Sequence, residues 1–167
     1  MPTLDIALDT WYSLNMVDER HSEEAAKMAP RDRKAKNQGS HWIRDARRLA
    51  IYNRDGFACC WCGVGLEDDA KLTLDHCKPY SYGGTTVSEN LITACHKCNS
   101  SRGNRSLASF ARSVAAYINH GLTARDILSH VRRCRARVLD VKWAREVISR
   151  RSSFSAALAY AAKEEMT

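Results

Sequence analysis

The sequence predicts an α+β fold that is mostly helical and is held together by a bound metal ion. Three observations lead to this prediction: two Cys-x-x-Cys pairs, two short strand-like runs between them, and helical periodicity on both flanks. A length of 167 residues allows one modest domain with appendages. We expect an N-terminal arm or docking helix with a basic linker in residues 1–39. We also expect a core in residues 40–105 and a basic helical extension in residues 106–167.

The two cysteine pairs predict a structural zinc site. Each pair presents two sulfur atoms from one tight turn, so two pairs complete a tetrahedral set. The predicted ligands are Cys59, Cys62, Cys95 and Cys98, with 32 residues between the pairs. The chain has seven cysteines, an odd number, which favours a reducing compartment over a disulfide framework.

The segment between the cysteine pairs has room for a β-hairpin. Residues 72–74 read Leu-Thr-Leu and predict a short strand that ends at Asp75 and His76. Gly83-Gly84 permits a sharp return of the chain. Residues 91–94 then predict a second strand that leads into the second cysteine pair, and a helix is expected after Ser100 to Arg105.

The N-terminal flank contains one clear helical pattern. Ser40 is a candidate N-cap, Asp55-Gly56 ends the helix, and the apolar face comprises Ile43, Ala46, Leu49 and Ala50. In residues 1–39, a docking helix and a disordered arm remain equally open. The apolar positions that would form such a helix are Leu4, Ile6, Ala7, Trp11 and Leu14.

Three helices are predicted after residue 105. The first runs from Leu107 to about Asn119, with an apolar face of Leu107, Phe110, Ala111, Val114, Tyr117 and Ile118 and a C-cap at Gly121. A capping box at Thr123 and Asp126 opens the second, whose apolar stripe is Ile127, Val131, Cys134 and Val138. Cys134 is expected as a buried free thiol. Asp140 begins a third helix, with Ala144, Val147 and Ile148 facing inward.

Positive charge concentrates in the C-terminal part. The net charge is +7, and residues 106–167 hold 11 basic against 5 acidic residues. This excess indicates a polyanionic partner. Arg132, Arg133, Arg135 and Arg137 are candidate nucleic-acid contacts, although a solvated helix face accounts for them equally well. The sequence shows neither a membrane-spanning run nor a signal pattern, so we expect no membrane partner and a cytoplasmic location.

The arrangement of motifs resembles the HNH endonuclease family. The matching residues are Asp75-His76-x-x-Pro79, Gly83-Gly84, Glu89-Asn90-Leu91, Cys95-x-x-Cys98-Asn99 and Arg102-Gly103. The resemblance covers roughly residues 42–105 and implies a ββα-metal core. Many members have histidine directly after the last cysteine of the second pair. Because Asn99 occupies that position here, the chain is similar to the H-N-N branch.

The resemblance also implies roles for the polar residues. His76 would be the general base, and Asp75 and Asn99 would hold one catalytic divalent ion. Asn90 would brace the loop that carries the base. An amide oxygen is a harder ligand than imidazole, which favours Mg²⁺ or Mn²⁺. Arg102, expected at the start of the following helix, and Arg105 are further candidate nucleic-acid contacts.

Together these features predict a metal-dependent endonuclease that hydrolyses phosphodiester bonds in double-stranded DNA. Two alternatives stay open: a non-catalytic zinc-dependent nucleic-acid-binding module and an RNA-directed nuclease. The family resemblance is consistent with a phage or bacterial source, and hence with a bacterial or phage-infected cell. The target sequence, nicking or double-strand cleavage, protein partners and oligomeric state are not determined by the sequence.

Overall fold

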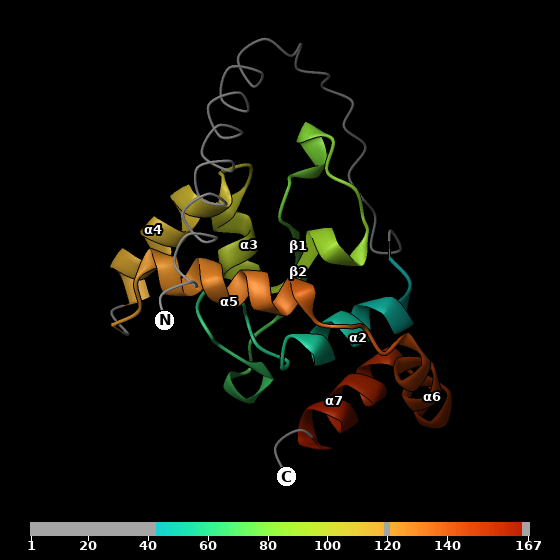
Figure 1. Cartoon of the computed structure of the whole chain (residues 1–167). Coiled ribbons are helices and arrows are strands. Elements are labelled where there is room, and N and C mark those ends of the chain that lie inside the picture. Colours follow the sequence, from blue (N-terminus) through green and yellow to red (C-terminus); the bar gives the residue numbers. More distant parts are fainter. Residues whose placement is uncertain (1–42, 119–120, 165–167) are drawn as a thin grey trace, which may run out of the picture. The chain divides into compact units, whose positions relative to one another are not determined.

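A computed structural model describes residues 43–118 and 121–164 (Figure 1). The expectations for residues 1–39 and for Ser40 lie outside this described part. The helices are α2 (Asp45–Arg54), α3 (His96–Arg102), α4 (Leu107–Ile118), α5 (Ala124–Ala136), α6 (Val141–Arg151) and α7 (Phe154–Glu164). The strands are β1 (Leu72–His76) and β2 (Leu91–Cys95), and the 3-10 turns are η1 (Leu66–Asp68), η2 (Tyr80–Tyr82) and η3 (Ser88–Asn90). The predicted mostly helical α+β fold is therefore confirmed.

The two strands form the predicted antiparallel hairpin. Leu72 pairs with Cys95 at one end, and His76 pairs with Leu91 at the other. β1 extends two residues beyond the predicted run, so Asp75 and His76 belong to the strand itself. All five residues of β2 are buried, as expected for a strand covered on both faces.

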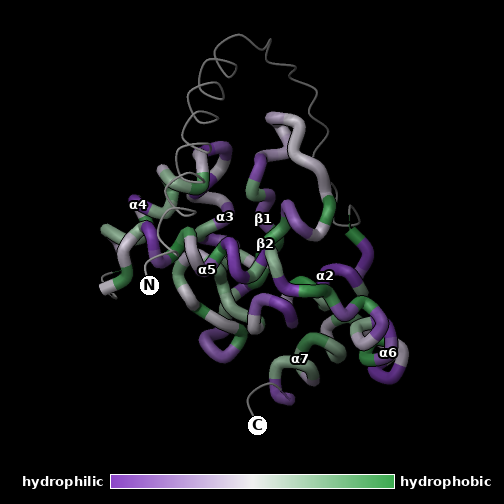
Figure 2. The backbone as a smooth tube through the Cα atoms, in the orientation of Figure 1, coloured by the Kyte–Doolittle hydropathy of each residue, from purple (hydrophilic) through white to green (hydrophobic). Residues whose placement is uncertain are grey.

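Two hydrophobic cores lie on either side of the hairpin. One core gathers the cysteine pairs, α4 and α5 around Trp61, and Ile92 of β2 points into it. The other gathers α2, α6 and α7, and Leu91 of β2 contributes to it. Figure 2 shows hydrophilic and hydrophobic stretches alternating along these helices, as expected for helices with one buried face. α4 and α5 therefore pack with the cysteine pairs, whereas α6 and α7 pack with α2.

A buried ion pair fixes α2 against β2. Arg54 Nε and Asp55 Oδ1 lie 2.7 Å apart, and both side chains are almost completely buried. Arg54 also donates to the carbonyl oxygens of Ser88 and Leu91, and Asp55 Oδ2 accepts from the backbone N–H of Thr93. α2 begins at Asp45 and ends at Arg54, with Asp55 as its C-cap at the predicted end of the helix.

Most C-terminal predictions are confirmed. The Thr123–Asp126 capping box opens α5, and Asp140 caps α6 by accepting from Trp143 N–H. Two positions in the predicted apolar faces are wrong: Tyr117 is 68% exposed and Val138 is 92% exposed. Tyr117 lies at the edge of the α4 stripe, and Val138 follows the end of α5 at Ala136.

Two helices differ from the sequence prediction. α3 begins at His96, inside the second cysteine pair, and not after Ser100. Arg102 consequently lies in the last turn of α3 and not at the start of a following helix. α7 was not predicted, because its alanine-rich sequence has a weak polar face. In the described part of the chain, no helix is long and apolar enough to cross a membrane.

Candidate active site and metal centre

The four predicted zinc ligands converge on one point. The sulfur atoms of Cys59, Cys62, Cys95 and Cys98 all lie within 4.8 Å of one another. Cys62 Sγ and Cys95 Sγ are 3.9 Å apart. With zinc–sulfur bonds of about 2.3 Å, a tetrahedral site needs sulfur atoms about 3.8 Å apart. The cluster can therefore hold a zinc ion with little movement.

Backbone structure brings the second cysteine pair into position. Cys95 ends β2 and caps α3, and its Sγ accepts a hydrogen bond from the backbone N–H of Cys98 at 3.4 Å. Hydrogen bonds from the thiols of Cys59 and Cys98 lower the pKa of the Cys62 thiol far below its usual range. The geometry thus favours a thiolate, the form that ligates metal, at this position.

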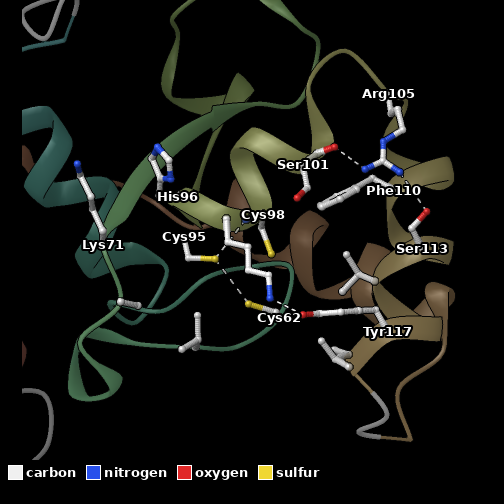
Figure 3. Close-up of a pocket in the computed structure, with 15 residues that line it drawn as sticks. Cys62, Lys71, Cys95, His96, Cys98, Ser101, Arg105, Phe110, Ser113 and Tyr117 are labelled. Carbon is white, nitrogen blue, oxygen red and sulfur yellow. Dashed lines mark hydrogen bonds between the residues drawn. The ribbon is translucent and has the colours of Figure 1, made fainter.

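A cavity of about 780 Å³ lies beside this cluster (Figure 3). Cys62, Cys95 and Cys98 form one wall, and Phe110 and Tyr117 of α4 form another. None of the four polar residues predicted for catalysis lines it. The cavity is therefore separate from the candidate catalytic residues.

His76 lies at the end of β1, opposite Leu91. Its ring is half-buried and lies 6.1 Å from the ring of Tyr80, measured between centroids. Burial lowers the pKa of His76 below its usual value, Asp75 opposes this shift, and Arg102 adds to it. This shift favours the neutral imidazole, the protonation state that a general base requires.

Asn90 holds the loop that follows His76. Its Oδ1 accepts from the backbone N–H of Lys78, and its Nδ2 donates to the carbonyl oxygens of Lys78 and Thr85. Gly84 packs so closely that an added Cβ would lie 1.9 Å from the Lys78 carbonyl oxygen. One buried amide thus fixes both ends of the loop.

Asp75 is the centre of a buried polar cluster that the sequence motifs do not reveal. It is 4% exposed, and Arg102 is 1% exposed. Arg102 donates from Nε to Asp75 Oδ2 and from Nη2 to Oδ1, both at 2.6 Å. Trp61 Nε1 donates to Asp75 Oδ2 at 3.0 Å. Arg102 is therefore engaged inside the protein, which differs from the expected phosphate contact.

Asn99 projects from α3 toward β1. Its Nδ2 donates to Thr73 Oγ1 at 3.0 Å and to the Leu74 carbonyl oxygen at 3.1 Å. Neither bond uses Oδ1, so the amide oxygen remains available as a ligand atom. The Asn99 side chain thus contacts β1 next to Asp75, because Leu74 directly precedes Asp75 in that strand.

The candidate nucleic-acid contacts fall into different environments. Arg105 is exposed, and its guanidinium lies 4.9 Å from the centre of the Phe110 ring. Arg135 donates to the Glu89 carbonyl oxygen, and Arg137 donates to the Arg54 carbonyl oxygen at 2.9 Å. Those two arginines attach α5 and its C-terminal end to the core. The other two candidates, Arg132 and Arg133, are exposed on α5.

Comparison with known proteins identifies the family. Residues 59–115 match a family described as HNH endonuclease, and this segment contains both cysteine pairs, the hairpin and α3. HNH endonuclease is thus the family that this segment of the chain matches. The predicted resemblance is therefore confirmed, and nuclease activity is the function typical of this HNH segment.

Two larger proteins contain regions similar to this chain. A stretch of 79 residues is 32% identical to the CRISPR-associated endonuclease Cas9 of Corynebacterium diphtheriae, covering 47% of this chain and 7% of that protein. The crystal structure of the Type II-C Cas9 enzyme from Actinomyces naeslundii aligns with a TM-score of 0.41 and 22% identity, over 95% of this chain and 15% of that one. The chain thus spans only a small part of either relative.

We predict that zinc bound by the four cysteines is required for the HNH domain to fold. Structural zinc contributes about 10–16 kcal/mol in small peptides, whereas whole domains are stable by about 5–15 kcal/mol. Replacing Cys98 by serine should therefore release this zinc and unfold the core. Zinc content and circular dichroism, measured on the same preparations, test this. Cys77→Ser, a change at a buried cysteine outside the cluster, should retain the metal. A zinc-free protein with an unchanged melting profile would contradict the prediction.

We also predict that Asp75→Ala strongly destabilises the protein. The substitution leaves the Arg102 guanidinium buried without a counter-charge, which typically costs about 3–5 kcal/mol. Urea unfolding measures the loss. Glu146→Ala, at an exposed acidic residue of α6, should change stability by no more than about 0.5 kcal/mol. The double variant Asp75→Ala/Arg102→Met should recover part of the lost stability, because it also removes the unpaired guanidinium. Equal stabilities of Asp75→Ala and Glu146→Ala would refute the ion-pair interpretation.

Proposed function

We propose that this chain is a metal-dependent DNA endonuclease in which His76 is the general base. The observation that carries the proposal is the half-buried imidazole of His76, whose pKa is lowered and which β1 and the Asn90-braced loop hold in place. The match of residues 59–115 to the HNH endonuclease family supports phosphodiester hydrolysis as the reaction.

The proposed role of His76 is to accept a proton from the attacking water. A base can do this only when it is unprotonated, and burial keeps His76 in that form. Asp75 is adjacent in sequence but is paired with Arg102, so its negative charge is largely compensated. The imidazole therefore does not gain the positive charge that an uncompensated neighbouring carboxylate would favour.

Asn90 has a positioning role in this proposal. Its side-chain amide hydrogen-bonds to backbone atoms of Lys78 and Thr85, so the proposed role of the amide is to shape the loop. A rigid loop keeps the base in one orientation, which is needed because proton transfer depends on distances of about 3 Å.

Asp75 and Asn99 are the proposed ligands of the catalytic divalent ion. Asn99 Oδ1 is available, and Asp75 Oδ1 accepts one hydrogen bond where a carboxylate oxygen can accept two. These hard oxygen donors fit Mg²⁺ or Mn²⁺. Arg102 would share the Asp75 carboxylate with the ion or give way to it. When bound, the ion would stabilise negative charge on the phosphate and leaving oxygen.

DNA is the proposed substrate because the chain carries a net charge of +7 and exposes basic side chains next to the nuclease core. α5 packs against β2 and η3, so its exposed arginines belong to the same folded unit as His76. The Corynebacterium relative is itself described as an endonuclease, which supports a nuclease over a binding module.

Cleavage by a His76→Ala variant tests the proposal. Removing a positioned general base should slow cleavage about 10²–10⁴-fold while leaving zinc content, melting temperature and DNA affinity unchanged. Plasmid DNA and a single-stranded RNA are incubated with wild type and variant across Mg²⁺ and Mn²⁺ titrations. Cleavage and binding are measured on the same preparations.

His96→Ala is the matched control, because His96 is exposed on α3 and has no proposed catalytic role. It should cleave like the wild type. Equal cleavage by wild type and His76→Ala would assign the activity elsewhere. Binding without cleavage of either nucleic acid would favour the binding module, and cleavage of RNA alone would favour the RNA-directed nuclease.

A second prediction concerns DNA affinity. Each neutralised phosphate contributes about −0.9 to the slope of log affinity against log salt on duplex DNA. The double variant Arg132→Gln/Arg133→Gln should therefore make the slope shallower by about 1.8. Arg132→Lys/Arg133→Lys keeps both charges and should keep the slope. An identical slope in the wild type and both double variants would show that these side chains are exposed to solvent without contacting DNA phosphates.

A further inference from the structure

Three potential metal ligands outside the four-cysteine cluster converge in the first hydrophobic core. They are Cys60, His130 and Cys134, whose ligand atoms all lie within 4.8 Å of one another. Cys60 and Cys134 are 3% and 0% exposed, and His130 is half-buried. None of the three belongs to the predicted zinc set, although Cys60 directly follows Cys59.

Separate elements hold these residues in place. His130 and Cys134 are four residues apart on α5, so their side chains lie on one face of that helix. The capping box at Thr123 fixes the start of this helix. Cys60 is fixed by a hydrogen bond from its backbone N–H to the Thr93 carbonyl oxygen at 2.9 Å. The cluster is thus formed by tertiary packing between the first cysteine pair and α5.

The observed spacing agrees with tetrahedral coordination. Zinc–sulfur and zinc–nitrogen bonds of about 2.3 and 2.0–2.1 Å place the two ligand atoms about 3.6 Å apart at a tetrahedral angle. Cys134 Sγ and His130 Nε2 are 3.4 Å apart. A metal ion could therefore enter with shifts of only a few tenths of an ångström at this pair.

We propose that Cys60, His130 and Cys134 form a second zinc site, distinct from the four-cysteine site. Two thiolates and a neutral imidazole balance the charge of Zn²⁺, so the complex adds no net charge to the core. Because His130 is partly exposed, water can supply the fourth ligand. This proposal does not depend on the nuclease mechanism.

The second ion would join α5 to the nuclease core. Cys59 and Cys60 would serve different ions from adjacent positions, while the ligands on α5 lie next to the exposed arginines Arg132 and Arg133. The site would therefore anchor the proposed DNA-contacting helix to the first cysteine pair.

Two alternative states of this cluster would bind no additional metal. In the first, the thiols stay reduced and pack as small hydrophobic side chains. In the second, a disulfide joins Cys60 to Cys134 and removes two of the seven free cysteines. Metal content and thiol content therefore separate these two states from a zinc site.

The test measures metal stoichiometry on the full chain, expressed with added zinc and purified without chelator. We expect about two zinc ions per wild-type chain and about one in both Cys134→Ser and His130→Ala. Cys77→Ser is the control, because Cys77 is buried in the same core but belongs to neither cluster, and it should retain about two. Circular dichroism verifies that each variant is folded.

A measurement on the wild type alone keeps the proposal decidable if a variant fails to fold. Cadmium-113 NMR of the cadmium-loaded chain should give two resonances, one for each site. A single resonance together with one zinc ion per chain would overturn the proposal. Five titratable thiols in the unfolded, unreduced, metal-free chain, together with a cross-linked peptide that contains Cys60 and Cys134, would assign these two residues to a disulfide and would also overturn it. Retention of two zinc ions by folded Cys134→Ser would show that the second ion lies elsewhere.

Discussion

The buried carboxylate of Asp75 is the interaction on which the rest of the site depends. It joins β1 to the last turn of α3 through Arg102 and to the first cysteine pair through Trp61. A charge removed from water is tolerated only when its hydrogen-bonding capacity is nearly filled. The strand that carries His76, the helix that carries Asn99 and the turn of the first cysteine pair are therefore fixed relative to one another by a single group.

Asp75 therefore has two roles that compete for the same carboxylate. As an ion-pair partner it stabilises the fold, and as a proposed ligand it would offer an oxygen to a divalent ion. Arg102 and the ion would both interact with the negative charge of the Asp75 carboxylate. Metal affinity at this site therefore depends on how easily the carboxylate can bind the ion while it remains paired with the guanidinium. A loss of activity at position 75 consequently reports on folding as well as on catalysis, whereas His76 reports on catalysis more directly.

Short motifs with local chemistry could be predicted from the sequence, and tertiary partners could not. The cysteine spacing identified the four clustered thiols, and alternation around Thr73 identified β1. The partnership of Arg102 with Asp75 has no local signal, because the two residues are separated by 27 positions. The exposure of Val138 was missed for a similar reason: helical spacing continues to Val138, but α5 ends at Ala136. The roles of His76, Asn90 and Asn99 remain predictions.

The register of the hairpin separates Cys95 from His76 in space. Cys95 pairs with Leu72 and His76 pairs with Leu91, so the candidate zinc ligand and the proposed base occupy opposite ends of the same ladder. Four steps along a strand amount to about 13 Å, too far for a side chain at one end to contact a side chain at the other. A ligand exchanged at the cysteine end therefore leaves the direct contacts of His76 in place.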